Sequence, residues 1–406
     1  MPALLVSREG SLRVPSAPQV PGPCSAATSV RVSQVTDLKG LAGLAADYAQ
    51  LQTVVGNRLP FALHDWHLTW CRHFLNYHPR IEDRPRFCVL HDPSGRCVAI
   101  LPFIQSSRRF GPVRVTSLNM LGADPGITEI STPLVAAGYG ALAVRAARDL
   151  FSRLGEWDWI HWSGLSGELR DALSGEERLS WSEPLSDLVL DLPPTWEEFR
   201  SLLKRNIRES LRHCYNSLRR AGHRFELQVI ADPAGISPGL DRFLELHRMR
   251  AQLRNTVVHP DRFATRVSRD FLYEVCERLA RRGVTRLFAL RIGGEIVAMR
   301  IGFVVDDSLY LYYSGYDPRW ARYSVMTTTM AEAIKYAIAA GLTSVGLSPT
   351  RDLAKTRWGP RQVDYASAYE IRDRLRSRCA YAAYLKARGN ETPAWLRRLT
   401  TGRVWQ

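Results

Sequence analysis

One continuous stretch, residues 288–358, constrains the fold of this 406-residue chain more than any other. It opens with apolar runs at Phe288–Ile292 and Glu295–Phe303 on either side of a Gly-Gly turn, and Ser308–Ser314 follows after two aspartates. Apolar, β-branched and aromatic residues in short runs between turn residues predict a β-meander. The elements that follow the meander then limit the possible folds.

A loop, a helix and a short strand follow the predicted meander. Gly and Asp-Pro at Gly315–Trp320 predict the loop. Met, Ala and Ile predict a helix over about residues 323–340, which Gly341 ends. A strand at Ser344–Ser348 and the segment Lys355–Gly359 complete the stretch.

This order of elements resembles the acyltransferase domain of the CelD-like branch of the GNAT superfamily, whose two-domain relatives include the FemAB-like aminoacyl transferases. The matching residues are Ser314–Pro318, Trp320, Tyr323–Ser324, Gly341, Lys355 and Trp358. A looser match extends from about Leu59 onward. The resemblance implies an α/β fold with mixed sheets and an acyl-transfer reaction, but no single substrate.

The first half of the chain carries a weaker copy of the same pattern. Gly95, Val98 and Ala99 match Gly294, Val297 and Ala298 in fixed register. Further on, a predicted helix ends at Gly155 and a strand follows, as at Gly341. Two such matches in the same order favour duplicated units over chance similarity between hairpins.

We therefore expect two tandem GNAT-like units. The predicted divisions are a disordered, Pro-rich leader at residues 1–30, an N-terminal unit at 31–192, a catalytic unit at 193–372 and a basic helix and tail at 373–406.

The chain carries a net charge of +15 and its pI is about 9.8. This charge predicts attraction to anions such as CoA phosphates, tRNA or acidic lipid, without selecting one. The seven cysteines contain no C-x-x-C pair, so we expect neither a metal site nor a disulfide framework. The absence of a long apolar run or a secretory signal favours the cytoplasm and predicts no transmembrane segment.

The start of the helix near Tyr323 is the predicted donor site, because free N–H groups and the helix dipole attract the pyrophosphate of acyl-CoA. The residues assigned to this site are Arg322, Ser324, Met326, Thr327 and Thr328. Relatives usually have glycine where Met326 stands, which allows close approach of phosphate to the backbone. A packed helix end that binds nothing is the alternative.

A basic segment over residues 204–221 begins with Lys204 and Arg205. These two residues are predicted to contact phosphate, either the 3′-phosphate of CoA or a tRNA backbone. A solvated helix face is the default alternative.

Three residues are the predicted catalytic groups: Lys355, His247 and Tyr316. In the relatives, a lysine at the position of Lys355 is thought to position the donor or stabilise developing negative charge. His247 is the best-suited histidine for proton transfer, although a structural role is favoured. Relatives often have an acidic residue where Gly346 stands, so this segment assigns no general base.

The predicted acceptor pocket is rich in aromatic residues, which combine apolar area with a polar group. Its assigned members are Tyr312, Tyr313, Asp317, Trp320, Trp358 and Asp124. An aromatic core is the equal alternative, and Asp124 is favoured as a loop brace, although it and Glu129 are suited to a cationic amine.

The predicted function is transfer of an acyl group from acyl-CoA to an amine, or less favourably a hydroxyl, of a small or carbohydrate-like acceptor. Two alternatives remain: aminoacyl transfer from tRNA, and a non-catalytic scaffold in a polysaccharide-synthesis complex. The oligomeric state is left open.

Overall fold

The protein is described by a computed structural model that covers residues 30–110, 113–122, 126–155, 157–175, 179–253, 259–349 and 352–388. All but the last residue of the predicted leader lie outside these ranges, as does the basic tail beyond residue 388. The described chain is a mixed α/β structure, as the sequence predicts.

The strands are β1 (Arg31–Val35), β2 (Ile81–His91), β3 (Cys97–Phe110), β4 (Val113–Met120), β5 (Leu134–Val135), β6 (Trp159–Leu165), β7 (Leu179–Asp191), β8 (Phe225–Ile230), β9 (Thr285–Ile292), β10 (Glu295–Val305), β11 (Ser308–Tyr316), β12 (Ser344–Gly346) and β13 (Arg361–Ile371). Within the described ranges they form one 13-stranded sheet. Its order is β1-β2-β3-β4-β6-β13-β7-β12-β11-β10-β9-β8, with β5 paired to β3.

The helices are α1 (Leu38–Gly43), α2 (Ala45–Val55), η1 (Pro60–Ala62), α3 (His64–Phe74), α4 (Gly140–Ser152), α5 (Gly167–Leu173), α6 (Trp196–Leu202), α7 (Arg205–Arg220), α8 (Pro233–Ala251), α9 (Arg266–Arg281), η2 (Pro318–Tyr323), α10 (Val325–Ala339), α11 (Leu353–Thr356) and α12 (Leu375–Arg388). α9 begins at Arg266, where the Thr265 hydroxyl caps the first turn. None of the described helices has the length and apolar character needed to cross a bilayer.

The two halves of the chain repeat one arrangement. In the first half, the antiparallel strands β2, β3 and β4 lead into α4, and β6 then pairs parallel to β4. In the second half, β9, β10 and β11 lead into α10, and β12 pairs parallel to β11. The tandem architecture predicted from the hairpin motifs is therefore present.

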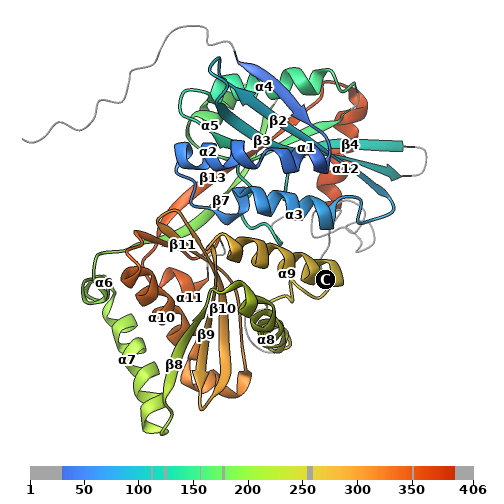
Figure 1. Cartoon of the computed structure of the whole chain (residues 1–406). Coiled ribbons are helices and arrows are strands. Elements are labelled where there is room, and N and C mark those ends of the chain that lie inside the picture. The colour runs from blue at the N-terminus through green and yellow to red at the C-terminus, as the bar shows by residue number, and fades with distance from the viewer. Residues whose placement is uncertain are drawn as a thin grey trace, which may run out of the picture.

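The two lobes in Figure 1 are joined by the long strands β7 and β13. β13 follows the second lobe in sequence but lies between β6 and β7, and β7 also pairs with β12. Each lobe therefore depends on hydrogen bonds to the other's strands. β7 ends at Asp191, next to the predicted division at residue 192. β13, which the prediction places in the second unit, pairs with β6 and β7 of the first.

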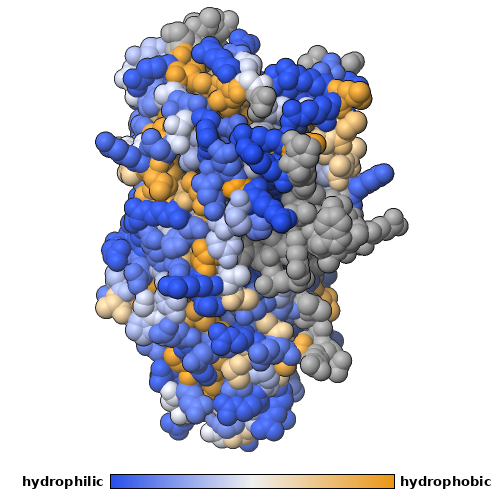
Figure 2. Space-filling model, turned by 90° about the vertical axis from the view of Figure 1, so that its right-hand side faces the viewer, coloured by the Kyte–Doolittle hydropathy of each residue, from blue (hydrophilic) through white to orange (hydrophobic). Residues whose placement is uncertain are grey.

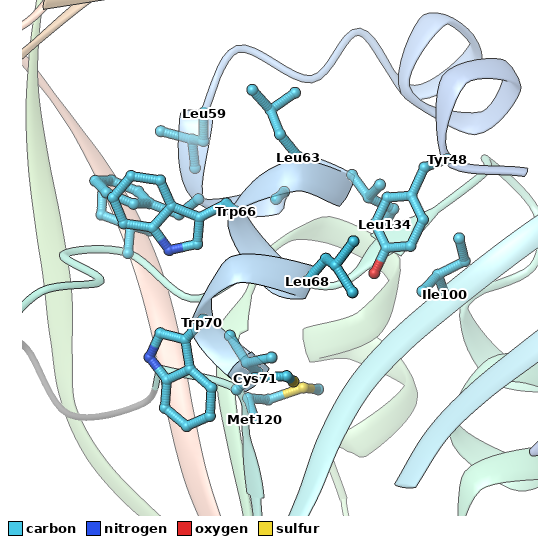
Figure 3. Packing of buried hydrophobic residues seen from close by; sticks show 14 of the residues in the cluster. Tyr48, Leu59, Leu63, Trp66, Leu68, Trp70, Cys71, Ile100, Met120 and Leu134 are labelled. Atoms are coloured by element: carbon cyan, nitrogen blue, oxygen red, sulfur yellow. The ribbon is translucent and has the colours of Figure 1, made fainter. Parts of the chain in front are cut away.

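Aromatic side chains fill the junction between the lobes. Figure 3 shows Trp66 and Trp70 projecting from α3, with Tyr48 and Leu134 near Ile100 farther along the same cluster. The Trp66 ring is fully buried and packs edge-on against Tyr312 of the second lobe at 5.9 Å. Burying such a ring contributes roughly 2–3 kcal/mol, so α3 binds the lobes together.

Helices cover both faces of the second half of the sheet. α6, α7 and α10 pack on one face through a cluster that includes Leu309, Leu311 and Val345. α8 and α9 pack on the other face, beside the first lobe. The side of the molecule seen in Figure 2 is mostly hydrophilic, with apolar residues in separate patches.

Candidate active site

The candidate site lies where β11 and β12 diverge. The two parallel strands are in register from Ser308 and Ser344 to Tyr310 and Gly346, where β12 ends while β11 continues beside β10. Side chains alternate between the faces of a strand, so Leu309 and Val345 point to α10 while Tyr310 points to the opposite face. The divergence therefore gives access to the sheet from two sides.

The α10 side carries the predicted donor-binding groups. Among the described residues, no side chain caps the first turn of α10, and its N-cap residue Ser324 has a φ of 53°. Nη2 of Arg357 donates to Oγ1 of Thr327 at 2.7 Å, which brings a guanidinium to this helix end. Uncapped N–H groups beside a guanidinium suit a phosphate or pyrophosphate.

Met326, where relatives usually have glycine, is half-buried and packs against the cluster that contains Tyr323 and Val325. Thr328 is fully buried, and its hydroxyl has no hydrogen-bond partner among the described residues. In this turn, the Thr327 hydroxyl therefore contacts the Arg357 guanidinium, whereas the Thr328 hydroxyl is buried.

The opposite side of the sheet carries a cleft of about 550 Å³ between the two lobes. Its floor includes Asp187 of β7, Tyr310 of β11 and Gly346 of β12. The first lobe supplies one wall through residues 54–59 and 132–137. The cleft therefore meets the sheet at the point where β11 and β12 diverge.

Two carboxylates and one ammonium group form the polar centre of the site. Burial raises the pKa of both Glu129 and Asp187 to about 7, and each carboxylate also interacts with Lys355. The hydroxyl of Tyr310 donates to Oε2 of Glu129 at 2.8 Å. Near neutral pH, these carboxylates are therefore suited to accept and release protons.

Lys355 interacts electrostatically with both carboxylates. Its Nζ donates to Oγ of Ser348 at 2.7 Å, and Ser348 has a φ of 66°, which is rare for a residue other than glycine. Burial lowers the pKa of the ammonium, while the neighbouring Glu129 and Asp352 carboxylates oppose that shift. The strained turn at Ser348 thus holds an acceptor for the ammonium group.

Asp187 places a carboxylate beside Gly346, where relatives often have an acidic residue. A Cβ added to Gly346 would lie 2.9 Å from the Tyr310 ring and 3.7 Å from Oδ2 of Asp187. A larger side chain there would collide with that ring, and a carboxylate from the neighbouring strand already occupies the adjacent space. The site thus has a candidate proton acceptor that β12 does not supply.

His247 and Tyr316, the other two predicted catalytic residues, are not among the residues that line the cleft. Nδ1 of His247 is 3.1 Å from the Ser314 carbonyl oxygen, and its Nε2 accepts a hydrogen bond from the Arg262 backbone N–H at 3.3 Å. The first contact joins α8 to β11, and the second joins α8 to the segment that precedes α9. Tyr316 is half-buried against the cluster around Leu290 and Tyr323.

A β-bulge directs two of the predicted acceptor-binding tyrosines into the interface between the lobes. Tyr312 and Tyr313 together oppose the single residue Ile301. Their hydroxyls donate to the carbonyl oxygens of Ile127 and Gly126, at 2.5 and 2.6 Å respectively. A bulge re-aims side chains in this way, and here it ties β11 to the loop that carries Glu129.

Three other residues assigned to the acceptor are integrated into the packing. Asp317 is buried, and the hydrogen bond from Arg319 is the main cause of its lowered pKa. Trp320 contacts His223 with ring centroids 5.0 Å apart, and Trp358 is 3% exposed in the core under α10. Asp124 lies outside the described residues.

The basic residues predicted to contact phosphate are exposed. Arg205 donates to Glu209 at 2.7 Å, and Arg322 covers the Tyr323 ring at 4.8 Å. Lys204 is the exposed N-cap residue of α7. None of these residues lines the cleft that contains Asp187.

Sequence reasoning did not assign Asp187, Arg357 or Arg300 to the site. Arg300 is fully buried, and burial is the main cause that lowers its pKa to about 10. The available signal was a charged residue inside an apolar strand, as in Ser186–Leu190 and Glu295–Phe303. Such a charge is costly to bury unless it has a partner, so it marks a position worth testing.

Comparison with known proteins identifies the class. Residues 205–355 match the family model described as acetyltransferase (GNAT) domain. The solved structure of FemX matches with a TM-score of 0.59 and 10% identity, and the match covers 87% of this chain and 99% of FemX. Residues 205–355 therefore carry a GNAT domain, and the overall fold of the chain resembles that of FemX.

Two further solved structures resemble the chain less closely. L-PGS from Bacillus licheniformis matches with a TM-score of 0.48 and 11% identity, covering 84% of this chain and 97% of that one. The tandem GNAT protein from the clavulanic acid biosynthesis pathway matches with a TM-score of 0.43 and 11% identity, covering 84% of this chain and 98% of that one. No curated protein matches the sequence.

Proposed function

We propose that the protein transfers an acyl group from acyl-CoA to the amine of a small or carbohydrate-like acceptor. The proposal rests on one observation: the interlobe cleft reaches the sheet where β11 and β12 diverge, beside Asp187, Tyr310 and Gly346. In this arrangement the acceptor occupies the cleft and the donor approaches from the α10 side.

The residues divide the chemistry among them. Thr327 and Arg357, together with the start of α10, bind the phosphates of the donor. The Asp187 carboxylate accepts a proton from the attacking amine, and Glu129 behind Tyr310 sets the charge of the centre. The Lys355 ammonium stabilises the negative charge that develops on the carbonyl oxygen. As the carbon–nitrogen bond forms, the carbon–sulfur bond of the thioester breaks, and the CoA thiolate leaves and takes up a proton from solvent. Because Lys355 also lies near both carboxylates, it keeps the centre close to neutral.

An arginine-lined groove supports a second candidate, aminoacyl transfer from tRNA as in the FemAB-like relatives. The groove has a volume of about 640 Å³ and lies on α6 and α7. Its basic residues are Arg200, Arg205, Arg208, Arg212 and Arg219. Trp196 and Tyr215 line it as well, and arginines interspersed with aromatic rings suit an RNA backbone and its bases.

Calorimetric titration separates the two candidates. Acetyl-CoA, a longer acyl-CoA and an aminoacyl-tRNA are titrated into the protein at two salt concentrations. Binding of acyl-CoA that Arg357→Ala weakens, with turnover of an amine acceptor, supports the first candidate. Binding of tRNA alone, with a steep salt dependence that Arg208→Ala and Arg212→Ala reduce, supports the second. Binding of neither would refute both and leave the scaffold hypothesis.

A further inference from the structure

Three metal-ligating residue types meet in the first lobe, away from the transferase site. Asp47 comes from α2, His91 from the end of β2 and Cys97 from the start of β3. One carboxylate oxygen, one imidazole nitrogen and the thiol sulfur all lie within 4.8 Å of one another. His91 and Cys97 also face each other across the β2–β3 hairpin. The cluster thus joins a helix to both strands of a hairpin.

The separations suit a shared ion. Nε2 of His91 lies 3.3 Å from Oδ1 of Asp47, which is long for a hydrogen bond that involves a carboxylate. Zinc bonds to nitrogen and oxygen are about 2.0–2.1 Å long, which places two such ligands about 3.3 Å apart in a tetrahedral site. The Cys97 sulfur, within 4.8 Å, needs a shift of about 1 Å to complete three ligands.

The surroundings give a second indication. His91 is 8% exposed, and its Nδ1 is buried with no hydrogen-bond partner among the described residues. A buried nitrogen without a partner costs on the order of 1–3 kcal/mol. Cys97 is 3% exposed, and its thiol has only a weak sulfur contact, 3.8 Å from the Ala99 carbonyl oxygen. Coordination through Nε2 would give that nitrogen and the Cys97 thiol a stronger partner, while Nδ1 keeps its present surroundings.

We propose that Asp47, His91 and Cys97 bind one zinc ion that fastens α2 to the β2–β3 hairpin. A set of one sulfur, one nitrogen and one oxygen ligand suits zinc, with water in the fourth position. On binding, the Cys97 thiol releases its proton to solvent and the thiolate forms the zinc–sulfur bond. This inference does not depend on the transferase reaction.

Cobalt(II) and zinc titrations of the chelator-treated, full-length protein test the site. A Cys24→Ser, Cys379→Ser background removes an exposed thiol and one outside the described residues. We expect one cobalt per chain with a near-ultraviolet sulfur-to-cobalt absorption band, which zinc abolishes by displacement. We also expect zinc to raise the melting temperature. Absence of the band, or of any zinc-dependent shift, would overturn the proposal and leave an Asp–His hydrogen bond beside a core thiol.

Matched variants locate the ion. Cys97→Ser should abolish the absorption band, and His91→Gln should weaken zinc binding at least tenfold. Cys88→Ala changes a buried thiol in the same hairpin and should leave both unchanged. If Cys97→Ser does not fold, His91→Gln decides the matter, provided its far-ultraviolet circular dichroism equals that of the parent. Loss of the band in Cys88→Ala but not in Cys97→Ser would contradict the assignment.

Discussion

The two lobes share one arrangement of strands and helices but differ at the start of the equivalent helix. In the first lobe, the Glu168 carboxylate accepts hydrogen bonds from the backbone N–H groups of Gly138 and Gly140 at the start of α4. A Cβ on Gly140 would lie 2.7 Å from that of Glu168, so α5 closes this helix end. The first lobe therefore satisfies its own anion-binding position.

The second lobe leaves the corresponding position without a capping carboxylate among the described residues. Thr327 and Arg357 lie at the start of α10 instead. The strand that follows differs too. At Gly164 in β6, an added Cβ would lie 1.8 Å from the Ser131 carbonyl oxygen, whereas Lys355 and Asp187 lie beyond the end of β12. The two lobes thus share one arrangement of strands and helices, and the side chains at the helix start determine which lobe is suited to a ligand.

Of the substitutions that test the difference between the lobes, Lys355→Ala should have the largest effect on turnover. Turnover should fall roughly 100- to 1000-fold, because the site loses the cation that stabilises the developing charge. Steady-state kinetics with a fixed acyl-CoA measures the loss, and a thermal melt checks the fold. Lys335→Ala, at a half-buried lysine of α10 that pairs with Glu332, is the matched control and should stay within about threefold. Unchanged turnover in Lys355→Ala would remove the lysine from the mechanism.

Asp187→Asn should lower turnover about 100-fold at pH 7, because the amide cannot accept the proton of the amine. In the parent, kcat/KM should rise as pH increases to about 7, because the Glu129–Asp187 pair must lose a proton. The variant should lose that rise. Asp191→Asn, on the same strand but exposed and paired with Arg361, serves as the control. A parent-like pH profile in Asp187→Asn would assign the proton acceptor elsewhere.

Arg357→Ala should raise KM for acyl-CoA about tenfold and change kcat little, because it removes a contact to the donor phosphates. The comparison variant is Arg319→Ala, an exposed arginine of η2 paired with Asp317, which should leave KM for the donor unchanged. Equal effects of the two substitutions would indicate general electrostatic attraction rather than a built phosphate site.

Stability should fall as pH rises between about 4 and 7. Burial raises the pKa of Glu129 and Asp187 in the folded protein, so the folded state binds more protons than the unfolded state in this window. The loss is on the order of 3–4 kcal/mol for each carboxylate. Urea unfolding at several pH values measures it, and Asp187→Asn should flatten the curve. A curve that rises with pH over this window would contradict the raised pKa values.

Glu168→Gln should have the smallest effect, because Glu168 caps α4 of the first lobe and lies away from the proposed donor position. Loss of a charged group at the start of α4 costs about 1 kcal/mol, seen as a melting temperature lower by a few degrees. KM for acyl-CoA should not change, because the donor position lies in the second lobe. Altered donor binding would show that the lobes do not divide their roles as proposed.

Much of this architecture follows from local sequence. Apolar and aromatic runs separated by Gly-Gly and Asp-Asp predict β9, β10 and β11, and Gly341 predicts the end of α10, because turn and helix-end signals act over a few residues. The duplicated hairpin at Gly95 likewise predicts the tandem design. The motif also singles out Lys355 as a predicted catalytic residue, and in the structure Lys355 interacts electrostatically with Glu129 and Asp187.

Other features depend on contacts between distant segments. β13 lies between β6 and β7, and this exchange brings Asp187 beside Gly346. The bulge opposite Ile301 turns Tyr312 and Tyr313 toward the first lobe. No C-x-x-C spacing marks Asp47, His91 and Cys97, which only the packing of α2 on the hairpin gathers.

The sequence by itself determined the order of elements and their repetition, because these depend on short-range periodicity and turn chemistry. The tertiary structure alone decided which carboxylates are buried together and which helix start is closed by its own chain. Those properties depend on desolvation and on charges brought together from distant segments, and neither is encoded in residue spacing.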